Sequence, residues 1–505
     1  MPRLSHARHF ASNRATELAG AALAMTTTSA PRPSARGFLI YVGLLLAGIA
    51  IVMTVLQLGR DLGLPAASSS PAIQAAVAPQ VDVVLHVLAT LACVIFLGAI
   101  FGRLCQYVGQ PPVIGEIAAG LALGPSLLGW LSPEAMHGLI PPQAIDPHAA
   151  VATSLKVIAQ LGIILYMFLV GLDLNAAQLR HKARAAVAIS HASIVLPFVL
   201  GTVLSLWLYP MLSDRGVAFI SFALFMGVAM SITAFPVLAR ILTDRNLQNT
   251  PMGTVALSCA AADDVTAWCL LSLVVGVAKA EVGTAGLIAG GAAAFILVMF
   301  LVARPLLIRY AAFIDRSQGG LPTYAIASVY VLILSAAAMT EWIGIHAIFG
   351  AFLLGVVIPS ESGLANSFLS KLKEPVTVLL LPAFFAYTGM RTEIGLLNNW
   401  SQWAICAAII GVATLGKFGG SFIAARCAGE TWRDAGILGM LMNTRGLMEL
   451  IVLNIGLDLG VVSPTLFAMM VIMALVTTMI TSPVIQLLSP CDSAGKALGG
   501  GSPPL

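Results

Sequence analysis

Long apolar segments alternate with short polar connections along almost the whole chain. A helix that crosses a bilayer needs about 20 predominantly apolar residues. Segments of roughly this length lie near 37–58, 82–102, 112–130, 152–172, 185–208, 217–239, 252–278, 284–303, 322–340, 342–360, 375–390, 402–423, 435–457 and 465–489. Because backbone groups in lipid must be hydrogen-bonded within their own segment, this pattern predicts an all-α bundle of transmembrane helices.

The composition supports this interpretation and limits the function classes. The chain has 505 residues, of which 59% are hydrophobic and 10% are charged, whereas soluble domains carry about 25% charged residues. The connections are too short for a second folded domain, and the short Gly- and Pro-rich tail 490–505 leads us to expect no nucleotide-binding domain. The seven cysteines include no CxxC pair, so we expect free apolar fillers rather than metal ligands.

The basic residues orient the predicted helices. If the amino terminus is cytoplasmic, the outer connections hold only Arg60, Arg215, Lys279 and Arg391. Three more basic residues lie within spans, namely Lys156, Lys417 and Arg445. The other 19 of the 26 Lys and Arg lie on the cytoplasmic side, as the positive-inside rule expects. We therefore expect both termini to be cytoplasmic. Because the basic residues lie in the short connections on one side of the membrane, we do not interpret the net charge of +4 as a sign of nucleic-acid binding.

Segment 37–58 follows a basic tail, residues 1–36, and has two interpretations. The basic leader and the small residues Ala66, Ala67 and Ser68 are compatible with a cleaved signal peptide. The apolar run of about 21 residues is longer than the core of a usual signal peptide. We favour an additional amino-terminal transmembrane helix, and the sequence leaves cleavage open.

Without 37–58, the remaining segments divide into two units. Six segments within 82–278 and six within 322–489 flank the single segment 284–303. A unit of six helices begins and ends on the same side of the membrane. The single linking helix then crosses the membrane once more, so the second unit begins on the opposite side and is inverted relative to the first. Inverted repeats of this kind are typical of secondary transporters. The two halves are only weakly similar in residues, so this prediction depends on topology.

Two adjacent carboxylates, Asp263 and Asp264, interrupt the apolar segment 251-PMGTVALSCAAADDVTAWCLLSLVVGVAK-279. A carboxylate at bilayer depth is costly, so such residues usually face the interior of a bundle and mark an ion or proton pathway. Hard oxygen ligands suit Na⁺ or K⁺ rather than transition metals. Burial favours the protonated acid and a bound cation favours the carboxylate. A cation and protons would therefore compete for these oxygens, without a cofactor.

Lys417 lies well inside the predicted span 402–423. An isolated ammonium is costly there, and a carboxylate partner relieves the cost. The alternative is a side chain that extends to the membrane interface. Adjacent residues of a helix point about 100° apart. One of Asp263 and Asp264 can therefore pair with Lys417 while the other faces a cavity.

Four further ionisable residues lie in the predicted spans. Arg445 and Glu449 are four residues apart on one helix, which allows an ion pair that we interpret first as structural. Glu116 either packs at a helix end or lines an access funnel, and the sequence does not choose between the two. Lys156 lies one turn inside a predicted outer boundary, and we expect it to extend to the interface.

Two spans carry polar and helix-breaking residues near their centres. The first, the span near 217–239, includes most of the run 220-ISFALFMGVAMSITAFPVLARIL-242 and contains Thr233 and Pro236. The second, 435-AGILGMLMNTRGLMELIVLNIGL-457, contains Asn443, Thr444 and Gly446. The two spans hold the fifth place in their six-helix units. Broken helices at matching positions of two inverted halves are the best sequence indication of a transport site.

Five runs in these spans resemble the monovalent cation:proton antiporter superfamily, specifically its second branch. That branch includes bacterial sodium/proton antiporters, glutathione-gated potassium efflux systems and plant cation/proton exchangers. The resemblance covers about 82–489, with its motifs in the expected order. The matching runs are 110-QPPVIGEIAAGLALGPSLLG-129, 231-SITAFPVLARIL-242, 257-LSCAAADDVTAW-268, 415-LGKFGG-420 and 442-MNTRGLMELIVLNIGLDLG-460.

The resemblance implies the sodium/proton antiporter fold and a homodimer in which a core domain moves against a scaffold domain. By helix order, the scaffold comprises 82–172 and 322–390, and the core comprises 185–278 and 402–489. The segment 284–303 is then the helix that links them.

The resemblance also implies the roles of the site residues. Asp264 is the principal cation ligand and Asp263 pairs with Lys417. The crossed broken helices line the site with the residues Thr233, Asn443 and Thr444.

The first aspartate position separates subgroups of this branch. Many relatives carry Gln or Asn there, whereas Asp263 resembles the electrogenic sodium/proton type. We therefore expect a Na⁺/proton antiporter of a bacterial inner membrane, with a role in pH homeostasis. The alternative is an electroneutral K⁺/proton antiporter, and the sequence does not decide between Na⁺ and K⁺.

Three other classes fit less well. An intramembrane aspartyl protease needs two facing carboxylates that share a proton, and neighbours on one helix diverge. A cation channel uses rings of carbonyls or carboxylates around an open pore, and a buried lysine beside the site would repel the ion. An ion-sensing receptor would keep the fold without transport. We expect a transporter and no enzymatic activity.

Overall fold

A computed structural model describes residues 82–139, 150–173, 183–214, 216–245, 250–279, 285–316 and 322–488, with a few isolated residues besides. The chain divides between Ile51 and Val52, and the following description concerns the part from Val52 onward. The predicted tails 1–36 and 490–505 lie outside the described residues. So does the predicted additional helix 37–58, apart from Ala47, Ala50 and Thr54.

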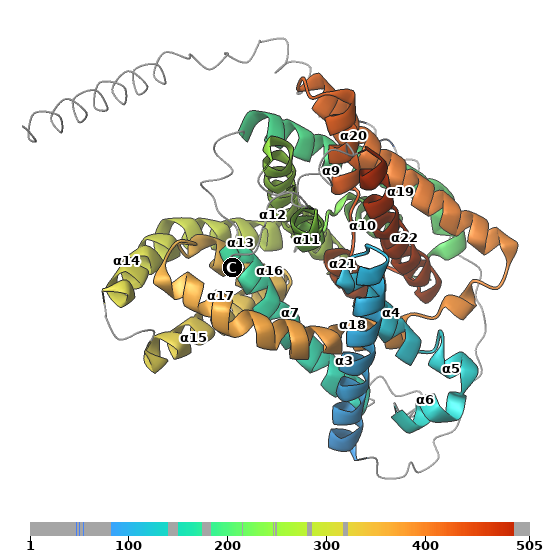
Figure 1. Ribbon diagram of the computed structural model, residues 1–505, viewed down its shortest axis with the longest axis horizontal. Coiled ribbons are helices and arrows are strands. Elements are labelled where there is room, and N and C mark those ends of the chain that lie inside the picture. Colours follow the sequence, from blue (N-terminus) through green and yellow to red (C-terminus); the bar gives the residue numbers. More distant parts are fainter. Residues whose placement is uncertain are drawn as a thin grey trace, which may run out of the picture. The chain divides into compact units, whose positions relative to one another are not determined.

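Every regular element in these residues is helical (Figure 1). The first half contains α3 (Val83–Tyr107), α4 (Pro112–Leu123), α5 (Leu128–Leu131), α6 (Pro133–Leu139), α7 (Ala150–Asp173), α9 (Ala183–Leu212), α10 (Phe219–Ser231), α11 (Phe235–Asp244) and α12 (Pro251–Lys279). The linking segment contains α13 (Ala285–Val298), the π-helical turn η2 (Met299–Ala303) and α14 (Arg304–Asp315). The second half contains α15 (Thr323–Ile343), α16 (Ala347–Val357), α17 (Gly363–Pro375), η3 (Val376–Leu380), α18 (Leu381–Arg391), η4 (Ile394–Leu396), α19 (Trp400–Cys427), α20 (Trp432–Met442), α21 (Leu447–Asp458) and α22 (Pro464–Leu488).

The helices confirm eleven of the thirteen membrane spans predicted between 82 and 489. The predicted span 342–360 contains only the shorter apolar helix α16, of 11 residues. Within the described residues, ten helical stretches are long and apolar enough to cross a bilayer, and α20 with α21 forms a further, bent pair. The helices follow the predicted order of six, one and six, which gives the inverted repeat. The chain is therefore an integral, multi-pass membrane protein.

Two predicted boundaries were wrong. The linking helix does not end near 303 but continues to Asp315, because α13, η2 and α14 follow one another without a break. The apolar segment near 375–390 is only the second part of a longer helix, because α17, η3 and α18 follow one another without a break from Gly363 to Arg391. The first part is amphipathic, with Lys371, Lys373 and Glu374 exposed, so hydropathy alone did not mark it. Pro375 does not end the helix because the π-helical turn η3 follows it directly, and such turns rearrange the local hydrogen bonds.

The described helices pack as two groups. In the first, α9 packs against α10, α12 and α19, and α19 packs in turn against α20 and α22. In the second, α7 packs against α16 and α18, α4 packs against α3 and α18, and α15 packs against α16. Figure 1 shows the first group in green and in orange to red, with α19, α20 and α22 beside one another.

Glycine pairs bring the helices of the second group into close contact. A Cβ atom on Gly120 would lie 2.1 Å from the carbonyl oxygen of Phe385, and one on Gly389 would lie 2.0 Å from the carbonyl oxygen of Gly120. The same holds for Gly171 and Gly355, where α7 meets α16. Without a hydrophobic driving force between helices in lipid, small residues allow the close backbone packing that holds a bundle together. The second group is therefore tightly packed.

Candidate functional site

Two broken helices meet in the first group. The chain is extended between α10 and α11, at residues 232–234, and it bends by 41° between α20 and α21. The backbone N–H of Ala234 donates to the carbonyl oxygen of Thr444 at 3.0 Å, so the two breaks touch. Gly446 has a φ of +153°, in a region that side chains disfavour. The structure thus has the crossed, discontinuous helices that the sequence predicted.

Asp263 of α12 lies at this crossing, and its carboxylate has four donors. Its Oδ1 accepts from Ser190 Oγ at 2.6 Å. Its Oδ2 accepts from Ser193 Oγ at 2.6 Å, from Thr233 Oγ1 at 2.7 Å and from Lys417 Nζ at 3.1 Å. Hydrogen bonds to the charged form of a carboxylate stabilise that form. Asp263 is therefore held in place by α9, α19 and the first break.

Two buried cations hold the carboxyl end of α10. Lys417 also donates to the carbonyl oxygens of Ser193, at 3.0 Å, and of Ser231. Arg445, in the second break, donates to the carbonyl oxygens of Ala229 at 2.9 Å and Met230 at 2.6 Å. The last carbonyls of a helix have no partner within it and carry partial negative charge. The two cations thus supply the donors that the interruption of α10 requires.

Asp264 is buried like its neighbour but has no comparable partners. Among the described residues, neither carboxylate oxygen accepts a hydrogen bond. The side chain lines a small cavity of about 10 Å³ together with Ile232, Trp268 and Met448, among others, which is about the space that one water molecule needs. A buried ionised group without a partner is costly. Asp264 is therefore the carboxylate that is available to a proton or a cation.

Arg445 and Glu449 form the ion pair that their spacing predicted, with 2.8 Å between Nη1 and Oε2, and neither side chain is exposed. The backbone of Arg445 is held as well, because Thr478 Oγ1 donates to its carbonyl oxygen and accepts from its N–H. The side-chain oxygen and nitrogen of Asn443, also in the second break, have no partner among the described residues. Thr444 Oγ1 instead donates to the carbonyl oxygen of Leu441 at 2.7 Å.

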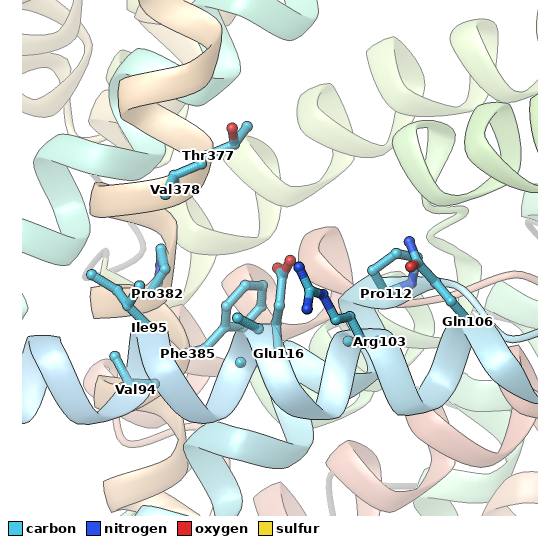
Figure 2. Close-up of a pocket in the computed structure, with 13 residues that line it drawn as sticks. Val94, Ile95, Arg103, Gln106, Pro112, Glu116, Thr377, Val378, Pro382 and Phe385 are labelled. Carbon is cyan, nitrogen blue, oxygen red and sulfur yellow. The ribbon is translucent and has the colours of Figure 1, made fainter.

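Glu116 of α4 lies apart from this crossing. It lines two cavities, one of about 330 Å³ and one of about 510 Å³. Figure 2 shows its carboxylate and the guanidinium of Arg103 pointing toward one another in the smaller cavity. The larger cavity has α4, α7, α17 and α18 on one side and α11 on the other. Of the two interpretations of Glu116, its position in these cavities fits the lining of an access path.

Neighbouring residues of α21 line both this cavity and the small one at Asp264. Leu447 lines the larger cavity and Met448 lines the smaller one.

Sequence reasoning missed Ser190 and Ser193. Both lie on α9, three residues apart and so on one face, within an otherwise apolar span. Polar hydroxyls at that spacing inside a span are the signal that could have found them. The expectation for Lys156 was incomplete, because its Nζ lies 3.0 Å from Oδ2 of Asp458. The partner comes from α21, far along the chain, so no local pattern indicated it.

Comparisons with known proteins agree with the fold. The profile of the family described as "Sodium/hydrogen exchanger, transmembrane" matches residues 91–489. The Na(+)/H(+) antiporter NhaS4 of Synechocystis is 44% identical over 421 residues, which cover 82% of this chain and 99% of that protein. The solved structure of the sodium proton antiporter MjNhaP1 from Methanocaldococcus jannaschii has a TM-score of 0.58 at 13% identity, over 82% of this chain and 98% of that one. That likeness supports the fold alone.

Two eukaryotic relatives are larger. Cation/H(+) antiporter 17 of Arabidopsis thaliana is 38% identical over 81% of this chain, and K(+)/H(+) antiporter 1 of Saccharomyces cerevisiae is 32% identical over 75%. The matched regions cover 49% and 44% of those proteins, so this chain spans about half their length. The resemblance read from the five sequence motifs is confirmed, and the chain belongs to the sodium/hydrogen exchanger family.

Proposed function

We propose that this chain is a secondary active antiporter that exchanges a monovalent cation for protons across the membrane. The observation that carries the proposal is the contrast between two adjacent carboxylates. Asp263 is saturated by four donors, whereas Asp264 is buried with no hydrogen-bond partner among the described residues. A cation and a proton are alternative ways to satisfy Asp264, and they exclude one another.

Exchange by alternating access requires that one part of the protein moves against another. In our proposal the moving core comprises 185–278 and 402–489, and the scaffold comprises 82–172 and 322–390, with 284–303 linking them. The packing of the helices into two groups supports this division. The cavity of about 510 Å³ lies between elements of the two groups and would give the cation its path from one face.

Na⁺ is the cation that we favour. The Synechocystis relative, which the alignment covers almost completely, is named as a Na(+)/H(+) antiporter, and its identity to this chain supports the same cation here. With both aspartates able to take up protons, more than one proton would move per cation, and exchange would be electrogenic.

An electroneutral K⁺/proton exchange is the second candidate. The yeast relative is named as a K(+)/H(+) antiporter. The hydrogen bonds at the crossing also favour the electroneutral alternative, because Lys417 has three acceptors and Asp263 has four donors. If these contacts persist through the cycle, only Asp264 carries a proton.

We further propose that the protein works as a homodimer in the inner membrane of a bacterium, with both termini in the cytoplasm. The basic residues of the connections support this orientation. It places the ends of α7 and α11 at Asp173 and Asp244, and with them the 510 Å³ cavity, toward the cytoplasm.

The experiment that tests the function is proton movement in proteoliposomes. The purified protein is reconstituted in vesicles that contain a pH-sensitive dye, and Na⁺ or K⁺ is then added outside under an imposed pH gradient. Dissipation of the gradient by Na⁺, saturable and absent in protein-free vesicles, supports the proposal. A response to K⁺ alone selects the second candidate, and no response to either cation contradicts both.

A further inference from the structure

A cluster of charges closes the face of the bundle where α21 ends. Asp458, the last residue of α21, places its Oδ2 3.0 Å from Lys156 Nζ of α7 and its Oδ1 2.6 Å from Arg391 Nη1 at the end of α18. One carboxylate thus binds two cations from two different helices. We call Lys156, Arg391 and Asp458 the clasp.

A second row of polar contacts lies one turn below the clasp. Arg391 Nη1 also donates to Asn454 Oδ1 at 3.2 Å and to Tyr387 Oη at 3.0 Å. Asn454 Nδ2 donates to Thr388 Oγ1 at 2.9 Å. Asn454 precedes Asp458 by one turn of α21, and Tyr387 and Thr388 precede Arg391 by one turn of α18. The two helices are therefore joined by polar contacts over two successive turns.

The clasp joins helices of different groups. α21 belongs to the second broken helix and packs against α10 and α22, whereas α7 and α18 belong to the other group. α21 also begins beside the candidate site, because its residue Met448 lines the small cavity at Asp264. A contact at the far end of α21 can thus control how the site-bearing helix sits against α7 and α18.

The two faces of the molecule differ in openness. Toward the ends of α7 and α11, a cavity of about 510 Å³ lies between the two groups. Beside the clasp, the cavity between the groups is only about 30 Å³, and Lys156, Asp458 and Asn454 are part of its lining. Apolar side chains such as Ile163 and Ile451 complete that lining. The passage is thus open on one face and closed by the clasp and an apolar layer on the other.

The exposure of the clasp suits a contact that opens and closes. The side chains of Lys156, Asp458 and Arg391 are 36%, 30% and 21% exposed, whereas those of Asp263 and Lys417 are fully buried. Partly exposed ion pairs contribute little to stability, because water can replace either partner. The clasp can therefore break without leaving a buried charge, which the pair at the crossing cannot do.

We propose that the clasp is a gate, and that its opening exposes the Asp264 site to the face where α21 ends. The inference rests on the proposed exchange by alternating access and assigns Lys156, Arg391 and Asp458 as positioning residues that do not bind the transported ion. Weakening the clasp should shift the population toward the state that is open on its own face. Loss of one such ion pair should change the ratio of the two conformational states about fivefold.

The test measures accessibility from each face in a chain whose native cysteines are replaced by Ala. Ile451→Cys reports on the layer beneath the clasp, and Val170→Cys reports on the 510 Å³ cavity. A membrane-impermeant maleimide is applied to the face where α21 ends to label the Ile451→Cys reporter. It is applied to the opposite face to label the Val170→Cys reporter. With Asp458→Asn, we expect labelling of the Ile451→Cys reporter to accelerate about fivefold and labelling of the Val170→Cys reporter to slow.

Two variants control the comparison. Asp458→Glu keeps the charge and should label nearly as the parent does, and Glu393→Gln removes an exposed carboxylate on the same face and should change nothing. The gate would be overturned if Glu393→Gln accelerated labelling of the Ile451→Cys reporter as much as Asp458→Asn does. It would also be overturned if neither Asp458→Asn nor Arg391→Gln accelerated that labelling. Labelling needs no ion exchange, so failure of the gate and failure of the proposed function give different results.

Discussion

The Nζ atom of Lys417 lies 3.1 Å from Oδ2 of Asp263, and neither side chain is exposed to solvent. Together with the hydroxyls of Ser190, Ser193 and Thr233, this pair gives the Asp263 carboxylate four donors. Asp264, in contrast, has no hydrogen-bond partner among the described residues. The two adjacent aspartates, which are the same residue type, therefore have different surroundings. Asp263 holds the crossing together, and in our proposal Asp264 is the group that exchanges a proton for a cation.

Asp264→Asn should abolish exchange without unfolding the protein. The amide has almost the same shape but carries neither the charge nor the titratable proton. Because Asp264 accepts no hydrogen bond from the described residues, we expect the melting temperature in detergent to stay the same or rise. The matched control is Asp214→Asn, on an exposed connection, which should exchange normally. Exchange at the parent rate by the Asp264→Asn protein would rule out this site.

Lys417→Ala should destabilise the protein. Removing one partner of a buried ion pair typically costs about 3–5 kcal/mol, because the other charge is left without compensation. Here the carbonyl oxygen of Ser231 also loses its donor. Lys371→Ala, which removes an exposed lysine of α17, should leave the melting curve unchanged. Equal melting temperatures for Lys417→Ala and the parent would show that the pair contributes nothing to folding.

The cation concentration needed for half-maximal exchange should rise as the pH falls. Protons and the cation compete for the same carboxylate, so a higher proton concentration must be offset by more cation. At pH values below the pKa of the shared carboxylate, the half-maximal cation concentration should rise about tenfold for each pH unit if one proton competes. The rise is steeper if two protons compete. Exchange rates at several cation concentrations and pH values test this. A half-maximal concentration independent of pH would mean that the two ions do not share a site.

The balance of charge should distinguish the two candidate exchange modes. If the pair between Lys417 and Asp263 opens during the cycle, both aspartates take up protons and about two enter for each cation that leaves. A Na⁺ jump applied to proteoliposomes on a solid support should then give a transient current. Exchange that produces no current and ignores a potential set with valinomycin would instead mean that the pair stays closed and only Asp264 cycles.

The sequence by itself determined the membrane topology and the presence of a charged site. Long apolar runs predict spans because lipid demands helices, and eleven of the thirteen spans predicted between 82 and 489 have helices long and apolar enough to cross a bilayer. The boundaries failed at the end of the linking helix and at the start of the helix that contains α17. The cost of burying Asp263, Asp264 and Lys417 is also a local property, which any fold must offset. The family motifs further implied that Asp263 pairs with Lys417.

Only the tertiary structure decided which atoms meet. Lys417 and Asp263 are 154 residues apart. The hydroxyls of Ser190 and Ser193 reach Asp263, and the carbonyl oxygen of Ser193 reaches Lys417, only because α9 packs against both α12 and α19. The ion-pair partner of Lys156, Asp458, also comes from a distant helix. Periodicity gives the face on which a side chain lies but not the helix that it faces, because packing between helices in lipid depends on close fits of small residues spread along the whole chain.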